Sequence, residues 1–235
     1  MTNLKFIFGR LLGAIPTLLV LICFAFFLVK SAPGGPFDFE RSLPEEVEKN
    51  LREAYNLDDP LYLQLTKYVG SILTGDFGPS FQYRDYTVTE LIMSGFPVSL
   101  RLGVSAIFLA LILGGTIGTI AALNQNSRLD YSVMFFGMVG ISIPNFVMAP
   151  LLVLIFSIAL NILPAGGYAN GSPLHMILPV IALALPQAAY IARLTRGSMI
   201  EVLNSNFVRT TRAQGLPLNT IMFKHVLKPT VLPVI

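Results

Sequence analysis

The chain has 235 residues, of which 54% are hydrophobic and only 12% are charged, with a formal net charge of +3. An average soluble domain has about 25% charged residues, so this composition indicates a protein of the lipid bilayer. The basic residues lie beside apolar runs and form no compact basic surface with stacking aromatics, which argues against nucleic-acid binding. The single cysteine, Cys23, lies in the first apolar run and has no partner for an intrachain disulfide or a cysteine metal cluster.

Long runs without charged residues predict the membrane spans, because a hydrocarbon core about 30 Å thick requires roughly 20 apolar helical residues. Four such runs are complete, and a fifth begins at the end of the sequence and looks cut short. We therefore expect an all-α, polytopic membrane protein. The expected spans are residues 11–29, 98–123, 131–160 and 174–192, with 229–235 as the start of a truncated fifth.

A cleaved signal peptide is the alternative interpretation of the first run. The run has 19 residues, 11–29, which is longer than the usual apolar core of about 7–15 residues. Lys30 also occupies the place where small residues are required before a cleavage site. We therefore expect this run to be retained as the first helix.

Lysine and arginine residues in short loops predict the orientation, because cytoplasmic loops carry an excess of both. Lys5 and Arg10 place the N-terminus in the cytoplasm, and the most basic loop then also falls inside. The predicted cytoplasmic segments are 1–10, 124–130 and 193–228, and the predicted extracytoplasmic segments are 30–97 and 161–173.

The first extracytoplasmic segment is expected to form a small helical domain. Ser42 and Glu45 have the spacing of a capping box and predict one helix. Apolar periodicity predicts a second helix from Leu61 to Leu73 and a further turn around Val88–Met93. Two roles fit this pattern equally: packing over the helix ends, and serving as a docking platform or lid at the outer mouth.

The spans themselves carry little that could bind an ion. Residues 102–123 and 131–160 contain no Asp, Glu, Lys, Arg or His, so the usual signature of ion-coupled transport is missing. Asn145 and Gln187 are candidate pore-lining residues, with hydrogen bonding between helices as the alternative. A straight helix over 131–160 would extend roughly 45 Å, so this run must tilt, kink or emerge. Gly114 and Gly118, at GxxxG spacing, allow close helix approach.

Motifs of catalysis are missing from the sequence. It contains no GxxxxGK[ST] phosphate loop, no HExxH, no GxSxG and no cysteine and histidine pairs at metal-binding spacing. His175 and His225 fall on opposite sides of the membrane in the predicted topology. We therefore expect no enzyme activity, with a membrane-embedded enzyme as the disfavoured alternative, and any ATP hydrolysis would occur on another chain.

The basic loop after residue 192 has the pattern of helix, break, helix. Residues 204–206 offer an N-cap for a short helix that would expose Phe207 and Val208 among cations. Gly215, followed by Pro217, predicts the end of that helix. A further helix is expected from about residue 219 to 227. For Arg193 and Arg196, the favoured interpretation is a basic anchor on the cytoplasmic side.

This loop resembles the coupling segment of ABC-transporter permeases, in the variant of the dipeptide, oligopeptide and nickel branch. The resemblance is carried by Arg-Gly-Ser-Met-Ile-Glu-Val-Leu at 196–203, Phe-Val-Arg-Thr at 207–210 and Arg-Ala-Gln-Gly-Leu at 212–216. Of the general permease consensus, Gly215 and Leu227 match. Residues 32–37 and 75–80 are similar to signatures of the first permease subunit of bacterial oligopeptide importers, whose members continue for two further spans.

The resemblance implies a type I ABC importer permease fold in the cell inner membrane. It implies import of oligopeptides, with dipeptides or nickel as alternative cargo. The implied partners are a second homologous permease subunit, two cytoplasmic ATPase subunits and an extracytoplasmic peptide-binding protein. ATP and Mg²⁺ would bind to those partner subunits and no cofactor to this chain. The implied contact with an ATPase subunit comprises Phe207, Val208, Arg209, Thr210, Thr211, Arg212, Ala213, Gln214, Gly215 and Leu216.

Overall fold

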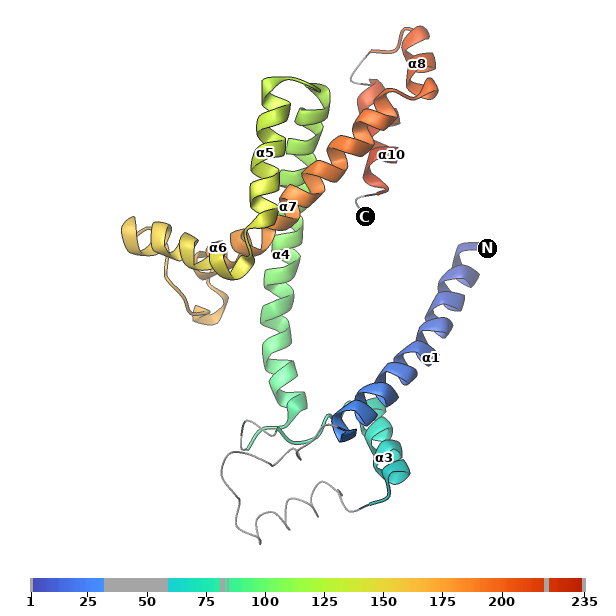
Figure 1. Cartoon of the computed structure of the whole chain (residues 1–235), viewed down its shortest axis with the longest axis vertical. Helices are drawn as coiled ribbons and strands as arrows, with labels where there is room; N and C mark the ends of the chain where they lie inside the picture. Colours follow the sequence, from blue (N-terminus) through green and yellow to red (C-terminus); the bar gives the residue numbers. More distant parts are fainter. Residues whose placement is uncertain (1, 32–58, 81–82, 84, 218–219, 234–235) are drawn as a thin grey trace. The chain divides into compact units, whose positions relative to one another are not determined.

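The computed structural model describes residues 2–31, 59–80, 83, 85–217 and 220–233. Across these residues the regular structure is helical, apart from one isolated bridge between Pro79 and Thr87. The expected all-α fold is therefore confirmed (Figure 1). The capping-box helix expected at Ser42 lies outside the described residues.

The segment Met1–Gly95 forms one compact unit. Its helix α1 (Thr2–Ser31) contains Pro16 and has apolar side chains exposed along most of its length. Helix α3 (Leu61–Thr74) packs on α1, where the ring centroids of Phe26 and Tyr68 lie 5.8 Å apart. The predicted helix from Leu61 is thus confirmed, and it ends at a left-handed glycine, Gly75.

Helix α4 (Val88–Leu123) begins at an unpredicted capping box. The Thr87 hydroxyl accepts from the Glu90 backbone N–H at 3.1 Å, and the Glu90 carboxylate accepts from the Thr87 N–H at 2.8 Å. These bonds satisfy two backbone donors of the first turn. The short turn expected at Val88–Met93 is therefore the start of a continuous 36-residue helix.

The segment Phe96–Ile235 forms the second compact unit. Besides most of α4, its elements are α5 (Arg128–Ser142), α6 (Asn145–Leu152), the π-helix η1 (Val153–Ala159), the 3-10 turn η2 (Ala169–Gly171), α7 (Pro173–Leu203), α8 (Asn206–Ala213), the π-helix η3 (Ile221–Val226) and α10 (Leu227–Val231). Pro229, expected to begin a new span, lies inside α10.

The apolar run 131–160 is divided rather than straight. Helix α5 ends at Ser142, and α6 with η1 continues at a bend of 103° (Figure 1). Pro144 disfavours a helical conformation in the residue before it, and Ile143 is accordingly extended, with φ −84° and ψ 117°. This run therefore kinks, which is one of the three outcomes that its length required.

Three of the described helices are long and apolar enough to cross a membrane, or four segments if the bent pair forms one span. The three are Lys5–Ser31, Val88–Leu123 and Pro173–Leu203. Helix α7 accommodates Pro179 and Pro186 and continues through Gly197 to Leu203, well past residue 192. The start of the basic loop is therefore a direct extension of α7.

Helices α4 and α7 pack through small residues spaced four apart. A Cβ atom added to Gly114 would lie 2.6 Å from the carbonyl oxygen of Ala188, and one added to Gly118 would lie 2.9 Å from the Thr195 Cβ. The close approach expected from the GxxxG spacing is thus confirmed. The buried small residues that follow this four-residue spacing are Ala106, Ala110, Gly114, Gly118 and Ala122 on α4, and Ala184, Ala188 and Ala192 on α7.

Candidate functional site

Helix α8 is a short, capped element that directly follows α7. The Ser205 hydroxyl accepts from the Val208 N–H at 3.4 Å and donates to the Val202 carbonyl at 2.7 Å. The hydroxyl therefore links the end of α7 to the first turn of α8. A capped helix within 204–216 is confirmed, with its N-cap at the middle residue of the predicted Asn-Ser-Asn sequence.

The inner face of α8 is tied into the apolar core of this unit. Val208 is fully buried in a cluster with Met199 of α7 and with Ile221 and Val226 of η3. Thr211 is also buried, and its hydroxyl donates to the Val208 carbonyl at 2.8 Å. The expectation that Val208 is exposed is therefore wrong, because η3 covers it from a part of the chain that local periodicity cannot place.

The outer face of α8 combines an aromatic ring with two cations. Phe207 is 52% exposed and stands edge-on to the imidazole of His225, with ring centroids 5.3 Å apart. Arg209 and Arg212 are exposed, and neither takes part in an ion pair with another described residue. The remaining exposed residues of the predicted segment are Thr210, Ala213, Gln214 and Gly215.

Gly215 ends the α8 segment in a left-handed conformation, with φ +76°. Its N–H donates to the Arg212 carbonyl at 3.0 Å. A Cβ atom at this position would have no described atom within 4 Å, so crowding inside this chain does not require glycine. The backbone conformation does favour it. Leu216, directly after the turn, is half-buried against the cluster that contains Val208.

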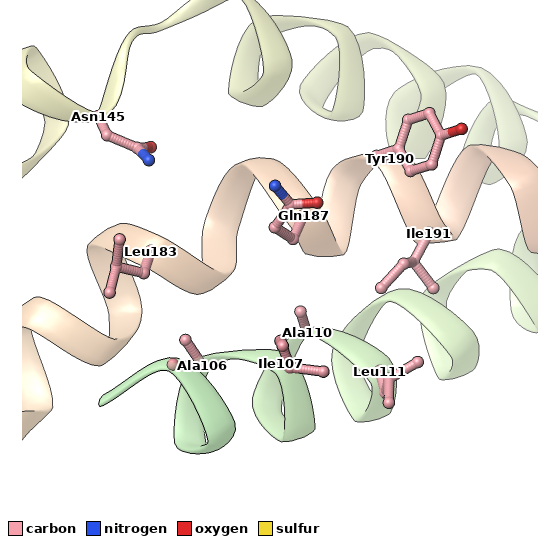
Figure 2. Close-up of a pocket in the computed structure, with 10 residues that line it drawn as sticks. Ala106, Ile107, Ala110, Leu111, Asn145, Leu183, Gln187, Tyr190 and Ile191 are labelled. Atoms are coloured by element: carbon pink, nitrogen blue, oxygen red, sulfur yellow. The ribbon is translucent and has the colours of Figure 1, made fainter. Parts of the chain in front are cut away.

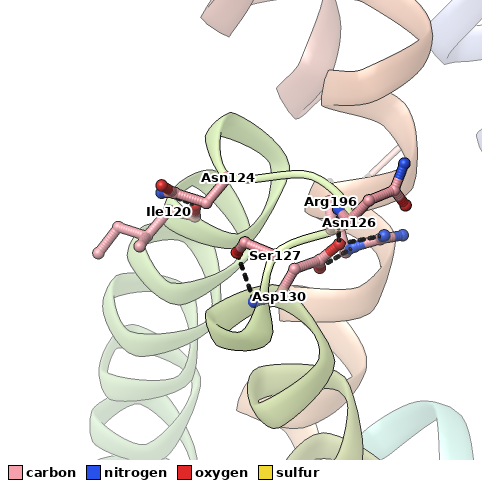
Figure 3. A network of polar contacts seen from close by, with 6 residues as sticks. All are labelled: Ile120, Asn124, Asn126, Ser127, Asp130 and Arg196. Atoms are coloured by element: carbon pink, nitrogen blue, oxygen red, sulfur yellow. Dashed lines mark hydrogen bonds and ion pairs between the residues drawn. The ribbon is translucent and has the colours of Figure 1, made fainter.

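An ion pair between Asp130 and Arg196 joins the first turn of α5 to α7, and no sequence pattern had predicted it. The Arg196 Nε lies 2.5 Å from Asp130 Oδ1, and Nη2 lies 2.7 Å from Oδ2 (Figure 3). The Asp130 side chain is fully buried and also accepts from the Asn126 N–H at 2.9 Å. Arg196 is therefore one half of a buried pair and not merely a basic anchor. The sequence did contain a signal for this pair, because Asp130 is the one acidic residue among residues 91–200.

Arg193, one turn earlier on α7, has a different environment. Its guanidinium carbon lies 5.8 Å from the ring centroid of Tyr190. The side chain of Arg193 is exposed. The anchor interpretation stays a prediction for Arg193, whereas Arg196 has a specific acidic partner.

A pocket of about 680 Å³ brings together the two candidate pore-lining residues (Figure 2). Asn145 contributes from the start of α6 and Gln187 from the middle of α7, while α4 forms the opposite wall. Neither side-chain amide makes a hydrogen bond to another described residue, so the alternative of a helix-to-helix bond has no support between these residues. The other lining residues are Gly103, Ala106, Ile107, Ala110, Leu111, Leu183, Tyr190 and Ile191.

The described residues offer no cluster for a metal ion. No group of three or more His, Cys, Asp or Glu side chains comes close enough together within the described ranges.

Comparison with known proteins identifies the family. The model of the binding-protein-dependent transport system inner membrane component matches residues 114–235, and its N-terminal companion matches residues 3–103. The chain belongs to this family. It is a polytopic helical permease of the inner membrane, and the predicted resemblance is confirmed.

Several curated relatives align with nearly the whole chain. The oligopeptide transport system permease protein OppB of Salmonella typhimurium is 55% identical over 99% of this chain and 76% of its own length. The OppB protein of Haemophilus influenzae is 56% identical over the same shares. The dipeptide transport system permease protein DppB of Bacillus subtilis is 45% identical over 98% of this chain and 74% of its own length.

Proposed function

We propose that this chain is a membrane subunit of an ATP-driven importer that moves oligopeptides into the cytoplasm. The observation that carries the proposal is 55–56% identity, over 99% of the chain, to oligopeptide permease subunits. Identity to a dipeptide permease subunit is lower, at 45%. Dipeptides are therefore the second candidate cargo.

The chain works with separate partner proteins in this proposal. A second homologous permease subunit completes the membrane path, two cytoplasmic ATPase subunits bind ATP and Mg²⁺, and an extracytoplasmic protein delivers the peptide. The N-terminus, the turn at 124–130 and the loop 193–228 lie in the cytoplasm, and residues 30–97 and 161–173 lie outside. The distribution of lysine and arginine supports this orientation.

Helix α8 is the contact with one ATPase subunit. Phe207 would fill a pocket on that subunit, and the exposed Arg209 and Arg212 would meet acidic groups. Val208 and Thr211 hold α8 on its own chain, so a push on the outer face reaches α7 through the buried cluster. What supports this role is a capped helix that exposes an aromatic residue, Phe207, and two arginines, Arg209 and Arg212.

The pocket at Asn145 and Gln187 is part of the peptide path, and its lining residues form one side of that path. Its apolar lining accepts varied side chains without selecting a charge. The two carboxamides can donate and accept hydrogen bonds, as peptide groups do. An uncharged wall of this kind is suited to peptides of mixed sequence.

Uptake by reconstituted vesicles tests the proposed function. The complete transporter would be assembled with both permease subunits, both ATPase subunits and the binding protein. Uptake of labelled di-, tri- and pentapeptides would be compared with and without ATP. We expect ATP-dependent uptake of the tri- and pentapeptides. Uptake of dipeptides alone would favour the second candidate, and uptake of no peptide would reject the proposal.

A further inference from the structure

Helix α7 carries three functional contacts in succession along its length. Gln187 faces the pocket, Arg196 binds Asp130, and Met199 belongs to the cluster that buries Val208 of α8. At 1.5 Å per residue, the 12 steps from Gln187 to Met199 span about 18 Å. No break interrupts the helix between them. A displacement of α8 can therefore be transmitted along α7 as far as the pocket.

The ion pair lies between the two ends of this path. On the pocket side, Thr195 packs against Gly118 of α4, and on the other side Met199 contacts the α8 cluster. The carboxylate of Asp130 also accepts the N–H of Asn126, a residue with positive φ in the α4–α5 turn. One carboxylate therefore fixes the turn, the start of α5 and the side of α7.

A bidentate pair suits the transmission of motion. Two parallel hydrogen bonds define both the distance and the angle between the partners, whereas a single charge contact defines only proximity. A lysine at residue 196 would keep the positive charge but could not make two parallel hydrogen bonds to the carboxylate. The fully buried carboxylate has no competing contact with water, so the geometry is held in place.

We propose that Asp130 and Arg196 are positioning residues that make α4, α5 and α7 move as one body when α8 is displaced. The pair thereby couples ATP hydrolysis on the partner subunit to the opening of the pocket. This inference rests on the proposed function. It assigns to the pair a role in the efficiency of transport, beyond a role in folding.

The experiment measures peptide uptake and ATP hydrolysis in the same vesicles and takes their ratio. The variants are Arg196→Lys and Asp130→Asn, and the matched control is Arg128→Lys, which makes the same change at an exposed arginine two residues before Asp130. We expect both pair variants to assemble and hydrolyse ATP, with uptake per ATP reduced at least fivefold. The control should keep the wild-type ratio.

A chemical cross-link separates coupling from stability. Asp130→Cys with Arg196→Cys, in a Cys23→Ser background, would be joined by a short bifunctional thiol reagent after assembly. We expect low uptake per ATP before the reaction and recovery of at least half of the wild-type ratio after it. The same reagent applied to the Cys23→Ser complex without the two new cysteines should leave its ratio unchanged, so recovery in the double-cysteine variant would be due to the restored link.

Each other outcome overturns the inference. If the wild-type complex transports peptide and the pair variants have the same ratio, the pair is not a coupling device, although the proposed function stands. If both variants fail to assemble and the cross-link restores nothing, the pair is structural only. If the wild-type complex moves no peptide, the proposed function fails and the inference falls with it.

Discussion

The ring of Phe207 in α8 stands edge-on to the imidazole of His225 in η3, with ring centroids 5.3 Å apart and ring planes at 73°. One flank of Phe207 is thus supported by its own chain, while the residue remains 52% exposed. A supported but accessible aromatic ring is suited to fill a pocket on another protein, because little side-chain freedom is lost on binding. This arrangement fits the proposed division of α8, in which the inner face attaches the helix to its own chain and the outer face recognises the ATPase subunit.

Phe207→Ala is expected to weaken the association with the ATPase subunit by about tenfold, as loss of an interface aromatic commonly does. Binding of the purified ATPase subunit to vesicles that contain the permease would measure it. Phe136→Ala is the matched control, because Phe136 is also exposed and edge-on to a neighbouring ring. Equal losses in both variants would contradict a specific role for Phe207.

Val208→Ala is expected to lower the free energy of unfolding by about 2 kcal/mol, because Val208 is fully buried. Thr210→Ala, on the exposed face, should change it by less than about 0.5 kcal/mol. Denaturant unfolding of the solubilised protein would give both values. A larger effect at Thr210 than at Val208 would mean that the two faces of α8 are wrongly assigned.

Gly215→Val is expected to uncouple ATP hydrolysis from uptake while the complex still assembles. The left-handed backbone costs a residue with a β-carbon about 1–2 kcal/mol. Gly215→Asn distinguishes a requirement for the left-handed backbone from a requirement for close approach of the ATPase subunit. Asparagine tolerates this backbone conformation but occupies more space than glycine. Normal uptake per ATP with Asn would assign the role of Gly215 to backbone conformation. Loss with both substitutions would assign it to close approach of the ATPase subunit.

Gly114→Ala is expected to destabilise the packing of α4 on α7 by about 1–3 kcal/mol, since its new Cβ would overlap backbone and side-chain atoms of α7. Gly115→Ala is the control, because a Cβ at residue 115 meets no described atom within 4 Å. It should be neutral or stabilise the helix by less than about 1 kcal/mol. Thermal unfolding midpoints would rank the two variants, and the reverse order would refute the packing.

The double variant Asn145→Ala with Gln187→Ala is expected to raise the KM for peptide uptake about tenfold, since two hydrogen-bonding groups leave the pocket. Binding of the extracytoplasmic protein and basal ATP hydrolysis should be unchanged. Asn124→Ala is the control, because that amide bonds only to the Ile120 carbonyl at 2.9 Å among the described residues. An unchanged KM in the double variant would remove the pocket from the peptide path.

Much of the helical framework follows from local sequence. The helix from Leu61 and the capped helix after Ser205 occur within a few residues of their expected bounds, whereas α1 begins at Thr2, nine residues before the expected first span at 11–29. Their signals are charge-free length, apolar periodicity and a serine before a helical segment, and all three act over neighbouring residues. The sequence was less informative at Pro144. The length of the run 131–160 showed that it could not be one straight span, but it did not predict the angle between α5 and α6.

The sequence by itself determined the class of protein, the helical segments, the short α8 with its cap and the resemblance to a permease family. Tertiary structure alone decided that η3 buries Val208, that Arg196 meets Asp130 and that Asn145 and Gln187 share one pocket. The physical reason is separation along the chain. Caps and apolar runs act between residues a few positions apart, whereas Asp130 and Arg196 are 66 positions apart and meet only once α5 has packed on α7.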